Sequence, residues 1–122
     1  MGLALVVGLA GSAGAVARYL LDGAVQDRTS GSFPYGTWTV NIVGSLILGI
    51  VGAVALRHAG TADLKAIAGS GFCGGLTTWS TASWETVRLI EARNTRTAVR
   101  FTFANLAASL LAAGVGLVLF AR

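Results

Sequence analysis

The sequence GFCGGLTTWST, residues Gly71 to Thr81, lies in the middle of an apolar segment that is long enough to cross a membrane. Three glycines and four hydroxyl residues at that depth predict a backbone that leaves helical geometry inside a bilayer. Lipid-exposed backbone cannot do this, because each unpaired N–H or C=O group in hydrocarbon costs several kcal/mol. The broken segment must therefore be buried in protein or line a polar path. Such breaks tend to mark ion or substrate sites, which makes the chain a candidate channel or transporter.

The composition of the 122 residues indicates an integral membrane protein. Hydrophobic residues make up 54% of the chain and charged residues 11%, against about 25% charged in a typical soluble domain. Four apolar segments each approach the ~20 residues that a membrane-spanning helix needs. They cover residues 3–21, 36–56, 65–90 and 99–120. We therefore expect an all-α membrane protein, with residues 1–122 forming one domain of four transmembrane helices, the third of them broken.

Several other classes of protein are excluded. The net charge of +4 comes from dispersed basic residues, without the compact patch that a nucleic-acid interface needs, and membrane lipid explains these residues better. Cys73 is the only cysteine and His58 the only histidine, so neither a metal site built on these types nor a Ser-His-Asp set has a plausible geometry. We expect no enzymatic activity.

The distribution of basic residues gives only a weak orientation signal. With four spans, both chain ends and the turn near residues 57–65 lie on one side of the membrane. That side carries Arg57, Lys65 and Arg122, and the other carries Arg18, Arg28, Arg88, Arg93, Arg96 and Arg100. Because Arg18 and Arg88 fall at span ends, the remaining bias is small. A chain of this kind can insert both ways, which would allow an antiparallel homodimer.

Two of the predicted helices carry a polar stripe with a spacing of four residues. The stripes are Thr37, Asn41 and Ser45 in the second segment, and Phe101, Asn105 and Ser109 in the fourth. An amide in lipid needs partners, so each stripe either joins helices or lines a pathway. The presence of two such stripes favours a polar track.

The side chains of the stripes and of the break suit an anion. Asparagine amides and serine or threonine hydroxyls donate hydrogen bonds, as Ser80 and Thr81 would just after the break. Aromatic ring edges carry partial positive charge, so Phe72, Trp79 or Phe101 could contact an anion edge-on. Glycine-rich broken backbone can instead offer carbonyl oxygens to a cation.

Few charged residues lie inside the predicted spans. Arg18, near the end of the first, either extends to the membrane surface or draws anions into a vestibule. Glu85 follows the break and has Arg88 three residues later, a spacing at which the two pair on a helix. An acid within a membrane is a candidate functional residue.

At these residues the chain resembles the Fluc (CrcB) family of fluoride channels. The first span has GAVARY at residues 14–19, the second has GTWTVNIVG at 36–44, and the third has GFCGGLTT at 71–78. Each stretch looks like the family motif of the corresponding span, and the resemblance covers essentially the whole chain.

The resemblance implies an antiparallel, dual-topology homodimer in a prokaryotic cell membrane, with two fluoride pathways that protect the cell by passive export. It also implies a structural Na⁺ at the dimer centre, held by the main-chain carbonyls of Gly74 and Thr77 from both subunits. By motif position, Asn41 would be a pore-lining donor. Asn105 and Ser109 would match the polar track of the fourth span, where serines are more usual in the family.

The resemblance also gives two charged residues a role and reveals one departure. Arg18 would lie near the vestibule, and Glu85 would match an acid close to the permeation path. The family has two phenylalanines three residues apart after the Thr-Thr pair, where this chain has Trp79 and Ala82. Phe101 is a candidate replacement for the missing ring.

Two alternatives to a homodimeric fluoride channel follow. Ala82 would suit a non-conducting or half-competent subunit that pairs with a paralogue in a heterodimer. A small proton-coupled multidrug exporter would also have four spans and dual topology. Such exporters have a coupling glutamate in the first span, and residues 3–21 contain no acid, which argues against this alternative.

Overall fold

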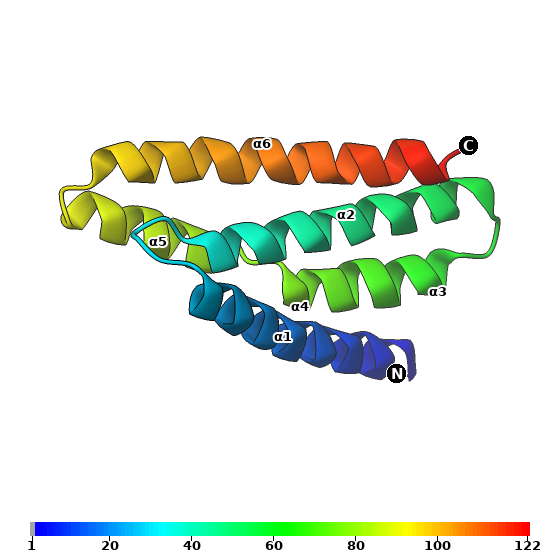
Figure 1. Ribbon diagram of the computed structural model, residues 1–122. Coiled ribbons are helices and arrows are strands. Elements are labelled where there is room, and N and C mark those ends of the chain that lie inside the picture. Colours follow the sequence, from blue (N-terminus) through cyan, green and yellow to red (C-terminus); the bar gives the residue numbers. More distant parts are fainter. Residues whose placement is uncertain (1) are drawn as a thin grey trace.

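The computed structural model describes residues 2–122, and these residues form helices without any strand. The elements are α1 (Gly2–Arg28), α2 (Tyr35–Arg57), α3 (Ala62–Leu64), the π-helical stretch η1 (Lys65–Cys73), α4 (Gly74–Leu76), α5 (Ser80–Glu91) and α6 (Thr95–Phe120). Figure 1 shows the two chain ends and the α2–α3 turn at one end of the bundle. The α1–α2 connection and the α5–α6 turn lie at the other.

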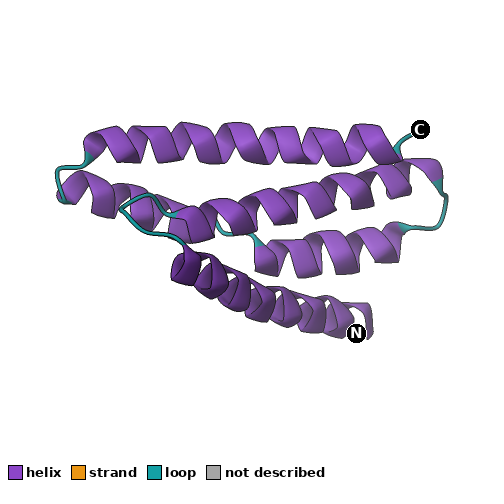
Figure 2. Ribbon diagram, in the orientation of Figure 1, coloured by secondary structure: helices purple, strands orange, loops and turns teal. Residues whose placement is uncertain are grey.

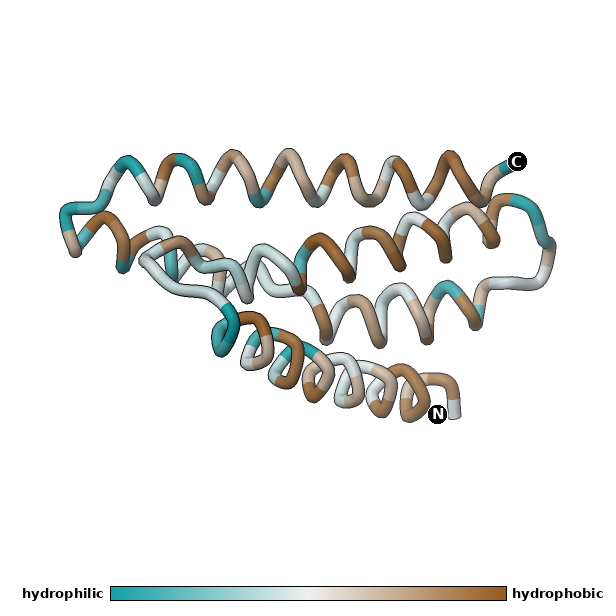
Figure 3. Tube along the Cα trace, viewed as in Figure 1, coloured by the Kyte–Doolittle hydropathy of each residue, from teal (hydrophilic) through white to brown (hydrophobic). Residues whose placement is uncertain are grey.

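The predicted all-helical architecture with an interrupted third passage is confirmed. Helices α1, α2 and α6 are each long and apolar enough to cross a membrane. The third passage runs through α3, η1, α4 and α5, and a short loop separates α4 from α5 (Figure 2). Apolar residues follow the helices, and polar residues gather at the connections (Figure 3).

The first helix continues beyond the predicted end of the first span at residue 21, so the connection to α2 is shorter than expected. Side chains in its last turns stabilise this extension. Gln26 donates to Asp22 Oδ1 at 2.9 Å, and Arg28 donates to the carbonyl of Ala24 at 3.0 Å. Thr29 Oγ1 donates to the carbonyl of Val25 at 2.9 Å. The bond from Thr29 uses a carbonyl oxygen that the helix end leaves without its backbone donor, because the N–H of Thr29 donates to the carbonyl of Gln26 instead.

Glycines bring the helices into close contact, because the absence of a side chain lets the backbones approach each other. In α1, a Cβ on Gly14 would overlap the carbonyl of Phe72, and one on Gly75 of α4 would overlap the carbonyl of Gly11. The same packing joins α2 to α6, where a Cβ on Gly49 would overlap the carbonyl of Ala113. The backbones therefore touch on both sides of the broken passage.

Large apolar side chains cover the outside of the bundle. Leu5 and Leu9 of α1 and Leu110 and Leu111 of α6 are all more than three-fifths exposed, whereas few large side chains are fully buried. A water-soluble monomer rarely exposes so much apolar surface. These faces are suited to contact lipid or another subunit.

Candidate ion-binding site at the helix break

The helix break begins where the backbone of Thr77 becomes extended, with φ −78° and ψ 160°. In a continuous α-helix the N–H of Thr78 would donate to the carbonyl of Gly74. Here it donates instead to Asn41 Oδ1 of helix α2, at 2.8 Å. The side chain of Asn41 thus replaces one bond of the helix, and the carbonyl oxygen of Gly74 loses its helical partner.

A second diversion occurs on the other side of the break. The N–H of Thr81, the helical partner of the carbonyl of Thr77, donates to Thr78 Oγ1 at 3.1 Å. The carbonyl oxygen of Thr77 is therefore also released from the helical ladder. The two carbonyls that were predicted as cation ligands are thus both left without their helical donors.

The surroundings of these two residues differ. Gly74 is exposed, and a Cβ placed on it would meet nothing within 4 Å. The side chain of Thr77 is anchored, because its hydroxyl donates to the carbonyl of Cys73 at 2.8 Å and its methyl group packs onto Gly44. One carbonyl thus lies on a rigidly held residue and the other on an open face of the subunit.

Asn41 is buried, with 7% of its surface exposed, and forms three hydrogen bonds. Its Oδ1 accepts from the N–H of Thr78, and its Nδ2 donates to the carbonyl of Thr78 at 3.1 Å. Nδ2 also donates to Asn105 Oδ1 of helix α6 at 3.1 Å. Both amide hydrogens of Asn41 are therefore used within the chain.

A cavity of about 580 Å³ lies beside this network, between α2, α5 and α6, and is called the Asn105 cavity below. Its lining residues include Asn41, Ser45, Thr78, Trp79, Ala82, Thr86, Phe101, Thr102, Asn105 and Ser109. None of the lining residues carries a charge. The hydroxyl oxygen of Ser109 is buried without a hydrogen-bond partner among residues 2–122. The site therefore offers neutral hydrogen-bond donors in an apolar setting.

The two aromatic candidates of the cavity have very different environments. Trp79 is 83% exposed, on the open side of the subunit. Phe101 is 1% exposed, and Phe33 of the α1–α2 connection packs edge-on against it at a centroid distance of 5.6 Å. The ring of Phe101 is thus mainly a core contact, while that of Trp79 is available to a ligand or a partner.

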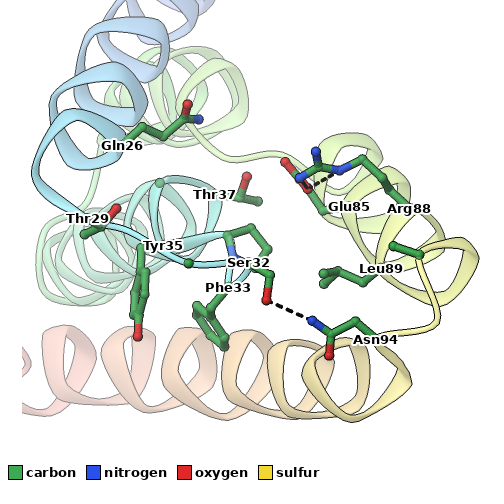
Figure 4. A pocket seen from close by; sticks show the side chains of 14 residues that line it. Gln26, Thr29, Ser32, Phe33, Tyr35, Thr37, Glu85, Arg88, Leu89 and Asn94 are labelled. Atoms are coloured by element: carbon green, nitrogen blue, oxygen red, sulfur yellow. Dashed lines mark hydrogen bonds and ion pairs between the residues drawn. The ribbon is translucent and has the colours of Figure 1, made fainter.

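A second cavity, of about 570 Å³, lies at the end of the bundle under the α1–α2 connection and is called the loop cavity below (Figure 4). Glu85 and Arg88 line it and form the ion pair that their spacing predicted, at 2.7 Å. On another wall of this cavity, Asn94 donates to Ser32 Oγ at 2.9 Å and ties the connection to the start of α6.

The structure brings together only some of the predicted pathway residues. Asn41, Trp79, Phe101, Asn105 and Ser109 line the Asn105 cavity. The remaining residues, Arg18, Ser80, Thr81 and Glu85, do not line it. Whether any of these residues contacts an ion stays a prediction.

Three threonines were missed by the reasoning from sequence. Thr78 is the centre of the hydrogen-bond network at the break, and Thr86 and Thr102 face each other across α5 and α6 with their hydroxyls 3.5 Å apart. Thr102 precedes Asn105 by three residues, so helical spacing could have placed it on the same face. No local pattern indicates the role of Thr78, because its partner lies 37 residues away.

Comparison with known proteins identifies the relatives of the chain. The family model described as "CrcB-like protein, Camphor Resistance (CrcB)" matches residues 5–117. A protein of Leifsonia xyli subsp. xyli named fluoride-specific ion channel FluC 1 is 48% identical over 113 residues, which are 93% of this chain and 82% of that protein.

Two further relatives carry similar names. Fluoride-specific ion channel FluC 2 of Cutibacterium acnes is 46% identical over 119 residues, 97% of each chain. Fluoride-specific ion channel FluC of Syntrophotalea carbinolica is 38% identical over 114 residues, 93% of each chain. The similarity thus extends over nearly the whole chain, with the break and both polar stripes inside it.

Proposed function

The chain belongs to the CrcB family, and from this membership together with the geometry of the Asn105 cavity we propose that it is a fluoride-selective ion channel. The observation that carries the proposal is the uncharged cavity beside the helix break, lined by amide and hydroxyl groups. Fluoride is small and strongly hydrated, and donors of this kind can replace its water. A proton-coupled exporter is not favoured, because the relatives are named as channels.

The transport would be passive and would need no covalent chemistry. Fluoride that enters the cell from acidic surroundings as neutral HF ionises in the more neutral cytoplasm and is trapped there. A channel in the cell membrane lets the anion leave down its gradient, and a negative interior potential assists its exit. The protein itself is a multi-pass membrane protein.

Two copies of the chain in antiparallel orientation would form the channel. The weak charge bias between the two ends permits both insertions. The open face around Gly74, with the exposed ring of Trp79 beyond the break, supports a subunit contact there, because neither residue is covered within the chain. A heterodimer with a paralogue is the alternative, for which Ala82 is the main argument.

A sodium ion at the centre of the dimer is part of this proposal. The carbonyl oxygens of Gly74 and Thr77 fit the role, since the N–H groups that would occupy them in a helix donate to side chains instead. Oxygen ligands also suit a hard cation. A bound ion would supply a fixed positive charge that holds these carbonyls of both subunits together.

Fluoride efflux from liposomes tests the function. The purified chain is reconstituted alone, and a fluoride-selective electrode follows efflux, with chloride efflux as the control. Rapid efflux of fluoride without chloride is expected. Chloride efflux at a similar rate would overturn the proposed selectivity for fluoride. Absence of efflux from a well-folded dimer would favour a half-competent subunit that needs a partner.

A further inference from the structure

The orientation of the Asn41 amide is determined by the backbone at the break. The N–H of Thr78 can only donate, so the atom of Asn41 that faces it at 2.8 Å must be Oδ1. Nδ2 of Asn41 then faces the carbonyl of Thr78 at 3.1 Å, which can only accept. Neither contact survives if the amide is turned over.

The orientation of Asn41 in turn determines that of Asn105. The second hydrogen on Asn41 Nδ2 points to the side chain of Asn105 at 3.1 Å, so the facing atom must be the acceptor, Oδ1. The NH₂ group of Asn105 is then directed away from Asn41, and it has no hydrogen-bond partner among residues 2–122. Among residues 2–122, the hydroxyl of Ser109 is the one side-chain polar atom that is both fully buried and without a partner. The NH₂ of Asn105 also has no partner, so it must retain accessible surface.

We propose that Asn105 is the amide that donates to the permeating anion and that Asn41 is a positioning residue, which turns the NH₂ of Asn105 into the cavity without contacting the anion. The inference rests on the proposed function and deepens it. It reverses the expectation that Asn41 is the pore-lining donor. It also gives the Asn105 amide a donor neighbour one turn further along α6, the unpartnered hydroxyl of Ser109.

A turned Asn105 amide would be unfavourable on two counts. Its NH₂ would face the NH₂ of Asn41, donor against donor, and one buried hydrogen bond would be lost. Its carbonyl oxygen would face the cavity, where partial negative charge repels an anion. The hydrogen bonds from Thr78 to Asn41 and from Asn41 to Asn105 therefore favour anion binding, although none of these groups is ionised.

The three asparagines of the chain, Asn41, Asn94 and Asn105, allow a direct test. Protein labelled with ¹⁵N-asparagine in detergent micelles has three side-chain NH₂ groups, which single substitutions assign. Sodium fluoride is titrated at constant ionic strength, with sodium chloride as the control. We expect a saturable, fluoride-dependent shift of the Asn105 NH₂ protons. Those of Asn41 shift less, and Asn94, bonded to Ser32, serves as a reference.

Two substitutions test the two roles. In Asn41→Asp, a carboxylate oxygen replaces the Nδ2 that donates to Asn105 Oδ1 and to the carbonyl of Thr78. The carboxylate attracts the NH₂ of Asn105, so the fluoride-dependent shift of Asn105 is expected to disappear, and the lost bond to Thr78 should also lower the thermal stability. Fluoride efflux should fall at least about tenfold, the factor that loss of one hydrogen bond to a charged group gives. In Asn105→Asp, the acceptor for Asn41 is kept, so the hydrogen bonds at the break should persist while a negative charge in the cavity abolishes efflux.

The outcomes distinguish this inference from the proposed function. A fluoride-dependent shift at Asn41 but not at Asn105, in protein that conducts fluoride, would overturn the inference and leave the channel function standing. Normal efflux in Asn105→Asp would do the same. Absence of efflux from the unsubstituted chain, alone and with a paralogue, would overturn the function on which the inference rests.

Discussion

The backbone N–H of Thr78 donates to Asn41 Oδ1 at 2.8 Å, and this contact joins helix α2 to the gap between α4 and α5. The same N–H would bond the carbonyl of Gly74 in an unbroken helix. The side chain of Asn41 therefore satisfies the backbone that the break exposes and frees a carbonyl oxygen. A break inside a membrane becomes tolerable because a neighbouring helix supplies the missing partner.

Two adjacent glycines should respond differently to substitution by alanine. In Gly74→Ala the new methyl group meets nothing within the subunit, so folding of the chain should be unaffected. If a second subunit covers this face, dimerisation should weaken, which size-exclusion chromatography with light scattering measures. In Gly75→Ala the methyl group overlaps the carbonyl of Gly11, and the subunit should lose about 1–3 kcal/mol of stability. A Gly74→Ala protein that dimerises as well as the original chain would contradict a subunit contact at this point.

The contact between Gly44 and Thr77 should be separable by a double substitution. Gly44→Ala places a methyl group onto Cγ2 of Thr77 and should destabilise the fold by about 1–3 kcal/mol. Thr77→Ser removes that methyl and keeps the hydroxyl that donates to Cys73, so the double variant should recover most of the loss. Thermal unfolding in detergent measures the stability of the two single variants and of the double variant.

Gly52→Ala is the matched control for the Gly44 substitution, because it lies two turns further along α2. The nearest atom to its new methyl group is Leu117 Cδ1, at 3.9 Å. It should therefore unfold at nearly the same temperature as the unsubstituted chain. If Thr77→Ser leaves the Gly44→Ala defect unchanged, the threonine methyl is not the cause of the clash.

Some of this architecture was predictable because it depends on local composition. Three glycines and four hydroxyl residues in the middle of an apolar segment predicted the break, and the break lies at Thr77 to Trp79, within the quoted stretch. The spacing of Asn105 and Ser109 predicted that they share a face, and both line one cavity. Glu85 and Arg88 pair as their separation predicted.

Other features were not predictable because they depend on contacts between distant residues. The role of Asn41 at the break requires Thr78, and the burial of Phe101 requires Phe33, which reaches it from the α1–α2 connection. Helix α1 extends beyond its apolar residues because polar side chains such as Gln26 form hydrogen bonds within its last turns. Hydropathy predicts which part of a helix can contact lipid, but it does not predict the residue at which the helix ends.

Phe101 should contribute to stability more than to ion selectivity, because its ring is 1% exposed and lies under Phe33. Phe101→Ala should cost about 3–5 kcal/mol of stability. Phe101→Leu keeps most of the volume but has no ring edge, so it should cost less and preserve the preference for fluoride over chloride in liposome efflux. Loss of that preference in a stable Phe101→Leu channel would show that the ring contacts the anion after all.

The ion pair of Glu85 and Arg88 should affect flux more than stability. The side chain of Arg88 is 54% exposed, so solvent screens its half of the pair, whereas that of Glu85 is 12% exposed. Glu85→Gln keeps the size of the side chain and an oxygen acceptor for Arg88, so it should lower the unfolding temperature only modestly. The substitution removes a negative charge from the loop cavity and leaves Arg88 beside it, over the ring of Trp84 at 5.2 Å. If the loop cavity leads to the permeation path, fluoride efflux should rise at low ionic strength, and the rise should vanish at high salt, where the Debye length falls to about 3 Å. Arg88→Gln is the matched control and should slow efflux under the same conditions. Equal efflux from both variants at low salt would place this cavity outside the ion pathway.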